Sequence, residues 1–219
     1  QLGYYSVHPI YASLITAISI IFSISLFKIK KYQLLIIFGN ILLVLNLILL
    51  SRKSAIIIMG AFFLVFILFN KSIKVKIKAF ILFLFDYTNM SSSNLRLNLI
   101  DVSIDAIKEK PFFGYGIGDT KDILSNLEHK NDFFNNKYYN THNQYLNFML
   151  ATGFLGLLLF IIFLFKNLQF AILGSLEQFS IVLLFILLMF IENILDRQNG
   201  VIYFAVFINY FSFYNKINR

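Results

Sequence analysis

The chain has 219 residues, of which 58% are hydrophobic and only 14% are charged, and its formal net charge is +8. Soluble domains average about 25% charged residues, and disordered chains combine low hydrophobicity with high charge, so both classes are excluded. The basic residues are scattered between apolar runs, which argues against a nucleic-acid partner. The sequence has no cysteine, so neither a disulfide nor a thiolate metal site is possible. The composition therefore predicts an all-α, polytopic membrane protein.

Apolar runs of about the length that crosses a bilayer, 17–25 residues, recur along the chain. We expect a bundle of about seven transmembrane helices, at residues 10–27, 32–50, 55–69, 79–85, 146–165, 179–195 and 201–214. The fourth run is short, and its helix has to include flanking residues to cross. The predicted layout is four transmembrane helices in residues 1–90, a large external loop in residues 91–144, and three transmembrane helices in residues 145–219.

The distribution of charge predicts the orientation of the helices. Seven crossings place ten of the 19 Lys and Arg residues on one side, together with a single acidic residue, Glu177. Cytoplasmic loops are enriched in Lys and Arg, so this side faces the cytoplasm. The amino terminus then lies outside and the carboxyl terminus inside. The chain starts at Gln1 without a basic n-region, so we expect no signal peptide.

The external loop contains two expected helices and a turn. Apolar residues at 95, 99, 102 and 106 follow helical spacing, and Pro111 ends the pattern, which predicts an amphipathic helix on the membrane or on the bundle. Glycines at 114, 116 and 118 have the wrong spacing for a nucleotide fingerprint, so we expect a tight turn packed on the membrane surface. A second short helix is expected at residues 120–129. Residues 131–140, rich in Asn, Phe and Tyr, either stack on sugar rings or form a plain solvated loop.

A polar tetrapeptide, Thr141-His142-Asn143-Gln144, precedes the fifth expected span. Thr141 and Gln144 fit a capping box, which places His142 and Asn143 in the first helical turn. A helix start carries partial positive charge and free N–H groups, which suit an anion and favour a neutral imidazole that accepts a proton. His142 is therefore either a proton acceptor at a site or a side chain that only anchors the helix at the headgroups.

Four further ionisable residues fall at external ends of the expected spans. Arg52 is either a turn charge or a phosphate ligand, because a planar guanidinium matches phosphate geometry. Glu192 and Arg197 either take part in an internal salt bridge or belong to a site, since ionisable groups at the end of a span are costly unless paired or used. His8, which precedes Pro9, is either an acceptor contact or an anchor near the cap of the first span.

Three of these stretches together resemble the carboxyl-terminal half of the O-antigen ligase / O-antigen polymerase family of bacterial membrane proteins. They are Ser51-Arg52-Lys53-Ser54-Ala55, the segment from Arg96 through NLIDVSIDAIKEKPFFGYGIGD, and THNQYLNFMLATGFLGLLLF from Thr141. Glu192, Arg197 and Gly200 form a weaker fourth match. Family members usually have more spans, so we expect the amino-terminal part to be missing from this sequence.

The resemblance implies an inverting glycosyl transferase that moves a glycan from undecaprenyl pyrophosphate to a hydroxyl on a lipid or glycan acceptor. It implies action at the external face of the bacterial inner membrane, among membrane lipids, in surface polysaccharide assembly, with no cofactor and no metal. It assigns the pyrophosphate to Arg52 and Arg96, and the acceptor or general-base role to His142. The substrate contacts that we then expect are Asn143, Glu192, Arg197 and His8.

Two other classes of function are also open at this point. A transporter or flippase component of polysaccharide export would carry polar or broken segments at mid-span. Here the spans are nearly pure Ile, Leu and Phe, with Asn40 and Asn46 as the main exceptions. A membrane sensor or scaffold would bind a partner through the external loop, and single changes of Arg52 or His142 would then matter little.

Overall fold

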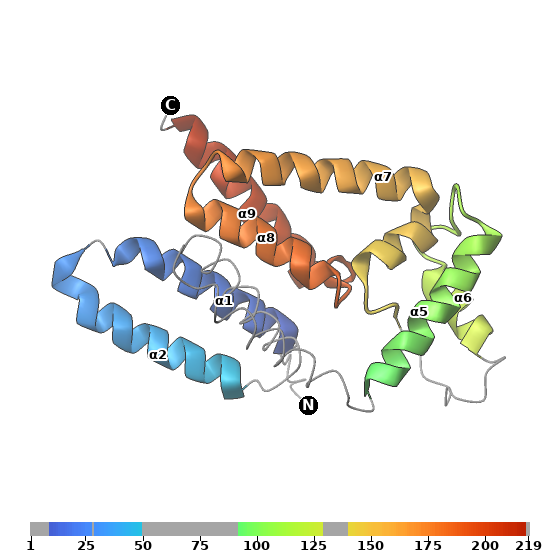
Figure 1. Ribbon diagram of the computed structural model, residues 1–219, viewed down its shortest axis with the longest axis horizontal. Coiled ribbons are helices and arrows are strands. Elements are labelled where there is room, and N and C mark those ends of the chain that lie inside the picture. Colours follow the sequence, from blue (N-terminus) through green and yellow to red (C-terminus); the bar gives the residue numbers. More distant parts are fainter. Residues whose placement is uncertain (1–8, 28, 50–91, 129–139, 218–219) are drawn as a thin grey trace, which may run out of the picture. The chain divides into compact units, whose positions relative to one another are not determined.

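The structure, a computed structural model, describes residues 9–27, 29–49, 92–128 and 140–217. Within these ranges the chain forms helices and connecting turns and no strand (Figure 1), which confirms the predicted all-helical class for this part of the chain. The α-helices are α1 (Pro9–Leu26), α2 (Gln33–Leu49), α5 (Ser92–Glu109), α6 (Thr120–Glu128), α7 (Gln144–Ile172), α8 (Leu176–Met189) and α9 (Gln198–Ile217). Two 3₁₀ turns, η1 (Lys30–Tyr32) and η2 (Ile194–Asp196), precede α2 and α9.

Two of the described helical segments are long and apolar enough to cross a bilayer. They are the 18-residue stretch Lys30–Leu47, which contains most of α2, and the 29-residue helix α7. Helix α8 and the Pro9–Ser23 part of α1 are also apolar but shorter. The third and fourth expected spans, residues 55–69 and 79–85, lie outside the described residues, so the count of seven crossings stays a prediction.

In the structure, the helices of two expected spans end at other residues. The sixth span does not continue to residue 195, because α8 ends at Met189 and a turn followed by η2 takes over. In this turn the carboxylate of Asp196 accepts hydrogen bonds from Gln144 and Asn147 of α7, contacts that a continuing helix would prevent. Helix α7 continues beyond residue 165, where the fifth expected span ends, and runs on to Ile172 with Lys166 exposed on its surface.

The described helices belong to two compact units. The first contains α1, α2, the end of α7 from Leu168, α8 as far as Leu188, and α9. Helices α1 and α2 form an antiparallel hairpin in which the Ser23 hydroxyl lies 2.8 Å from Oδ1 of Asn40 (Figure 1). This contact gives Asn40, a polar exception within an apolar helix, a partner between helices. Helix α1 also contacts α9 through aromatic rings, with Phe22 stacked on Phe211 at 5.9 Å between centroids.

The second unit contains α5, α6, α7 as far as Asn167, and the segment Met189–Arg197. Helix α5 buries one face, formed by Leu99, Val102, Ser103 and Ala106, as its apolar spacing predicts. Val102 and Ala106 pack with Leu124 of α6 and Leu150 of α7. The sequence left open whether the apolar face of α5 packs on the membrane or on the protein. The structure shows that this face packs against α6 and α7. The expected second short helix is also confirmed, as α6.

Helix α7 is broken at Gly153, whose φ of +66° and ψ of −167° lie outside helical values, and Figure 1 shows the resulting bend. The break frees two carbonyls and one amide from their usual helical partners, and the loop between α5 and α6 supplies replacements. The bonds are Tyr115 N to Leu150 O (2.8 Å), Gly116 N to Ala151 O (2.9 Å) and Phe154 N to Pro111 O (2.8 Å). The expected turn is thus confirmed, and it docks on the backbone of α7.

Glycines are required where this loop touches the helix. A Cβ added to Gly114, whose φ is +68°, would lie 2.5 Å from the carbonyl oxygen of Leu150. A Cβ added to Gly153 would collide with the backbone of Phe112. Because both neighbours are backbone atoms, neither collision is relieved by a side-chain rotation. Gly114 and Gly153 are therefore explained by a close contact between two backbones.

Tyr115 ties the same loop back to the end of α5. Its hydroxyl oxygen lies 2.9 Å from the carbonyl oxygen of Ala106 and 2.9 Å from a carboxylate oxygen of Glu109. Burial, with the hydrogen bond to Glu109 as the second cause, raises the pKa of Tyr115 above its ordinary value. The shift favours the protonated phenol, which is the form that can donate to these two acceptors.

Candidate functional site

The turn before α7 holds His142 in an unusual backbone conformation. Its φ is +47°, the only positive φ among the described residues other than glycine. Its N–H donates to the side-chain oxygen of Asn140 at 3.1 Å, which stabilises the turn. A left-handed conformation costs a residue with a side chain roughly 1–2 kcal/mol. Such costs concentrate at functional sites, where the conformation aims a side chain.

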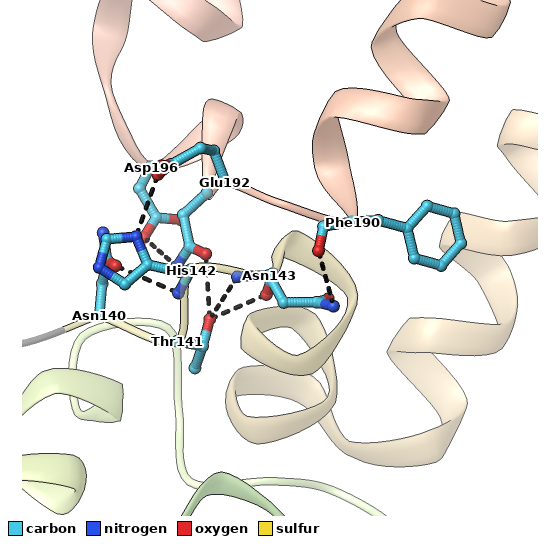
Figure 2. A network of polar contacts seen from close by, with 8 residues as sticks. Asn140, Thr141, His142, Asn143, Phe190, Glu192 and Asp196 are labelled. Atoms are coloured by element: carbon cyan, nitrogen blue, oxygen red, sulfur yellow. Dashed lines mark hydrogen bonds and ion pairs between the residues drawn. The ribbon is translucent and has the colours of Figure 1, made fainter. Parts of the chain in front are cut away.

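In this conformation the imidazole of His142 points at the carboxylate of Glu192, as Figure 2 shows, with 3.1 Å between Nδ1 and Oε2. An ionised carboxylate only accepts hydrogen bonds, so Nδ1 carries the hydrogen. In the neutral imidazole, Nε2 then keeps a free lone pair. The His142 side chain is 27% exposed and that of Glu192 only 12%, so the imidazole can be reached while the carboxylate is shielded.

Asn143 is the N-cap of α7. Its Oδ1 accepts hydrogen bonds from the N–H groups of Tyr145 at 3.0 Å and Leu146 at 3.1 Å, which otherwise have no helical partner. Its Nδ2 donates to the carbonyl oxygen of Phe190 at 3.2 Å (Figure 2). Both ends of the amide thus bond to backbone, and they join the start of α7 to the segment after α8.

The expected capping box between Thr141 and Gln144 is therefore wrong, and the two residues between them precede the helix. The reason is that both capping-box side chains have other partners. Thr141 Oγ1 lies 3.0 Å from Oδ1 of Asn193, and Gln144 Oε1 accepts from the N–H of Leu195 at 2.7 Å. Asparagine is as good an N-cap as threonine, so Asn143 takes the position that Thr141 leaves.

Asp196 completes the connection between α7 and the turn that carries Glu192. Its carboxylate accepts from three side-chain amides: Asn147 Nδ2 at 2.8 Å, Asn193 Nδ2 at 3.0 Å and Gln144 Nε2 at 3.4 Å. Hydrogen bonds to a charged acceptor are stronger than those between neutral groups. The sequence analysis did not predict this cluster. A usable signal was that polar residues occur both at the start of an apolar helix and in the turn after the next one.

We expect Asn143→Ala to lower the free energy of unfolding by about 0.5–2 kcal/mol, because α7 loses its N-cap. Chemical unfolding of the detergent-solubilised protein, followed by circular dichroism, measures this change. Asn143→Ser is the matched control, since serine is an equally good N-cap and loses only the bond to Phe190. An equal loss in both variants would contradict capping as the main contribution of Asn143.

The remaining expected site residues are only partly covered by the structure. Arg52 and His8 lie outside the described residues. Arg96 belongs to α5, but its side chain is not among those described. Arg197 is exposed and directly follows η2. The convergence of Arg52, Arg96 and His142 on one site therefore stays a prediction. In the described parts of the chain, no group of three or more His, Asp or Glu side chains is placed to hold a metal ion.

The helices and this site define a class: a helical membrane protein with a histidine–carboxylate pair at the start of an apolar helix. A sequence model of the family described as O-antigen ligase matches residues 10–161, and the chain belongs to this family. The family is one of membrane glycan transferases. No curated protein and no solved structure matches the chain. The family match includes His142 but ends before Glu192, so the pairing of the two comes from the structure alone.

Proposed function

We propose that the protein transfers a glycan from undecaprenyl pyrophosphate to a hydroxyl group on a lipid or glycan acceptor, in the assembly of a surface polysaccharide. The observation that carries this proposal is the pair of His142 and Glu192 at the amino-terminal end of α7, a helix long enough to cross a membrane. At such a position a proton acceptor is within reach of an acceptor hydroxyl and of a lipid donor whose pyrophosphate lies at the headgroups.

The proposed location is the external face of the bacterial inner membrane. In the topology that we propose, residues 1–90 cross four times, residues 91–144 form the external loop, and residues 145–219 cross three times. The amino terminus lies outside and the carboxyl terminus inside. The excess of Lys and Arg on one side of this arrangement supports it, because cytoplasmic loops carry that excess.

In the proposed reaction, the acceptor hydroxyl oxygen attacks the anomeric carbon of the donor sugar. A new carbon–oxygen bond forms as the bond from that carbon to the pyrophosphate oxygen breaks. The hydroxyl proton passes to Nε2 of His142, and undecaprenyl pyrophosphate leaves with the bonding electron pair. Attack opposite the leaving group inverts the anomeric configuration. Neither a metal nor a cofactor takes part.

Arg52 and Arg96 are the proposed ligands of the pyrophosphate. Guanidinium groups bind phosphate oxygens in a bidentate manner and stabilise the negative charge that develops on the leaving group. Arg197 and His8 are the proposed further contacts to substrate. The exposure of Arg197 beside η2 supports its part, because its guanidinium is accessible to a bound molecule.

In this proposal Glu192 and Asn143 act indirectly, by positioning His142. The bond from Nδ1 to Glu192 holds the tautomer in which Nε2 is the base. Asn143 holds the adjacent helix start against the turn that carries Glu192.

The test is a transfer assay with the full chain in proteoliposomes and an undecaprenyl-pyrophosphate-linked glycan. We expect Arg52→Ala and Arg96→Ala each to lower kcat/KM by about 10²–10³-fold, as removal of a group that stabilises developing charge does. Lys53→Ala, which removes the neighbouring cation, is the control and is expected to retain activity, and a chelator is expected to leave the rate unchanged.

Unchanged transfer by a variant lacking both arginines would overturn the assignment of the pyrophosphate ligands. Movement of the lipid-linked glycan across the membrane without any transfer would overturn the proposed function itself. That second outcome would favour a flippase component of polysaccharide export, which is the alternative from a different class.

A further inference from the structure

Three large apolar side chains stand exposed on the loop between α5 and α6. Phe112, Phe113 and Ile117, together called the loop tip, are 64%, 79% and 84% exposed. The loop is held firmly, since its amides bond to α7 and its glycines contact the backbone of that helix. A rigid, exposed apolar patch is typical of a surface that contacts lipid or another molecule.

The break in α7 marks the level at which this helix enters the hydrocarbon. The 19 residues that follow Gly153 and end at Ile172 measure roughly 29 Å at about 1.5 Å per residue, and the polar ones among them, Lys166, Asn167 and Gln169, lie toward the far end, where the cytoplasmic headgroups are expected. Before the break, α7 carries Gln144, Asn147 and Thr152, whereas residues 153–165 have no polar side chain. The loop that docks on the break therefore lies at the boundary between membrane and water.

The charged residues at the ends of the loop also favour a position at the boundary between membrane and water. Lys110 and Asp119 flank the loop tip, and an ionisable group within hydrocarbon is expensive, so the loop does not lie deep in the membrane. The Lys110 ammonium sits 4.8 Å from the centroid of the Tyr115 ring. Aromatic and aliphatic side chains combined with lysines are typical of segments that lie in the headgroup region.

We propose that the loop tip inserts into the bilayer at the boundary between headgroups and acyl chains, beside the start of the membrane-crossing part of α7. Lipid is the occupant because the exposed apolar surface of α7 begins at Phe154, the residue whose amide bonds to Pro111 in the same loop. The loop tip continues that lipid-facing surface outward. The insertion anchors α5 and α6 to the membrane surface. This inference rests on α7 crossing the membrane and not on the transfer chemistry.

The chain has no cysteine, so single labelling sites can be introduced into the full-length protein without background. We would label Phe113→Cys and Ile117→Cys with an environment-sensitive fluorophore in vesicles of phosphatidylethanolamine and phosphatidylglycerol. Asp105→Cys, on the solvent face of α5 with its side chain 70% exposed, is the matched control. Because all three side chains are exposed, the labels do not disturb packing.

At the loop tip we expect a blue-shifted emission, and quenching by lipids with a nitroxide near the headgroup that exceeds quenching at Asp105→Cys severalfold. Aqueous iodide should show the reverse order. Equal quenching of all three labels by iodide would place the loop tip in water and overturn the proposal. Protection from both quenchers would show protein cover, such as a second copy of the chain, and would overturn it too. No glycan donor is present, so failure here is distinct from failure of the proposed function.

Discussion

Replacing His142 with alanine should lower kcat for glycan transfer by about 10²–10⁴-fold, the usual contribution of a positioned general base. The variant loses the Nε2 lone pair that accepts the proton of the acceptor hydroxyl. Its fold should survive, because the described hydrogen bond of the imidazole is to Glu192 and the cap of α7 is made by Asn143. The measurement is the initial transfer rate in proteoliposomes at saturating donor. A normal rate would show that His142 is not the base.

Glu192→Gln separates positioning from substrate binding at the same site. If Glu192 acts by orienting the imidazole, kcat should fall by up to about 10⁴-fold, as when the carboxylate that orients a general-base histidine is replaced by its amide, with little change in KM. A rise in KM at constant kcat would instead show that Glu192 contacts substrate. Asp122→Asn is the control, because it neutralises an exposed carboxylate on α6 away from the histidine pair.

Replacing Gly153 with alanine should detach the loop between α5 and α6 from α7. A φ of +66° with a ψ of −167° is a conformation that essentially only glycine adopts and costs an alanine about 1–3 kcal/mol, and the collision of its Cβ with the backbone of Phe112 adds about 1–3 kcal/mol of overpacking. Hydrogen–deuterium exchange measures the result directly. We expect faster exchange at the amides of Tyr115, Gly116 and Phe154, which all bond across this contact.

Gly118→Ala is the matched control for this prediction, since it lies in the same loop. A Cβ at Gly118 meets no atom within 4 Å, so the substitution should leave exchange at these amides unchanged. Unchanged exchange in the Gly153→Ala variant would mean that the break does not depend on a glycine. The contact between the two backbones would then not be the reason for a glycine at position 153.

The elements of the external segment were predictable because their signals are local. The apolar spacing of α5 predicted its buried face, and Pro111, which cannot continue a helix, predicted its end to within a few residues. Glycines at alternate positions predicted a turn there. For these features the cause lies within a few residues of the effect, so a pattern in the sequence suffices.

The partners of the site residues were not predictable in the same way. Thr141 and Gln144 matched a capping box, yet both bond to the turn after α8, about 50 positions further along the chain. Tertiary packing decides whether such a side chain caps its own helix or bonds to a distant segment. A local sequence motif carries no information about that packing. The same holds for Glu192, for which the sequence left an internal salt bridge and a place in a site equally open.

Composition and hydropathy alone were enough to identify a helical membrane protein, and short motifs were enough for its family, because both depend on which residues occur and in what local order. The pairing of His142 with Glu192, the N-cap by Asn143 and the docking of a glycine-rich turn on a broken helix required the folded chain. Each of these joins backbone or side-chain atoms from separate segments, and only three-dimensional packing determines which of several chemically suitable partners is within hydrogen-bond distance.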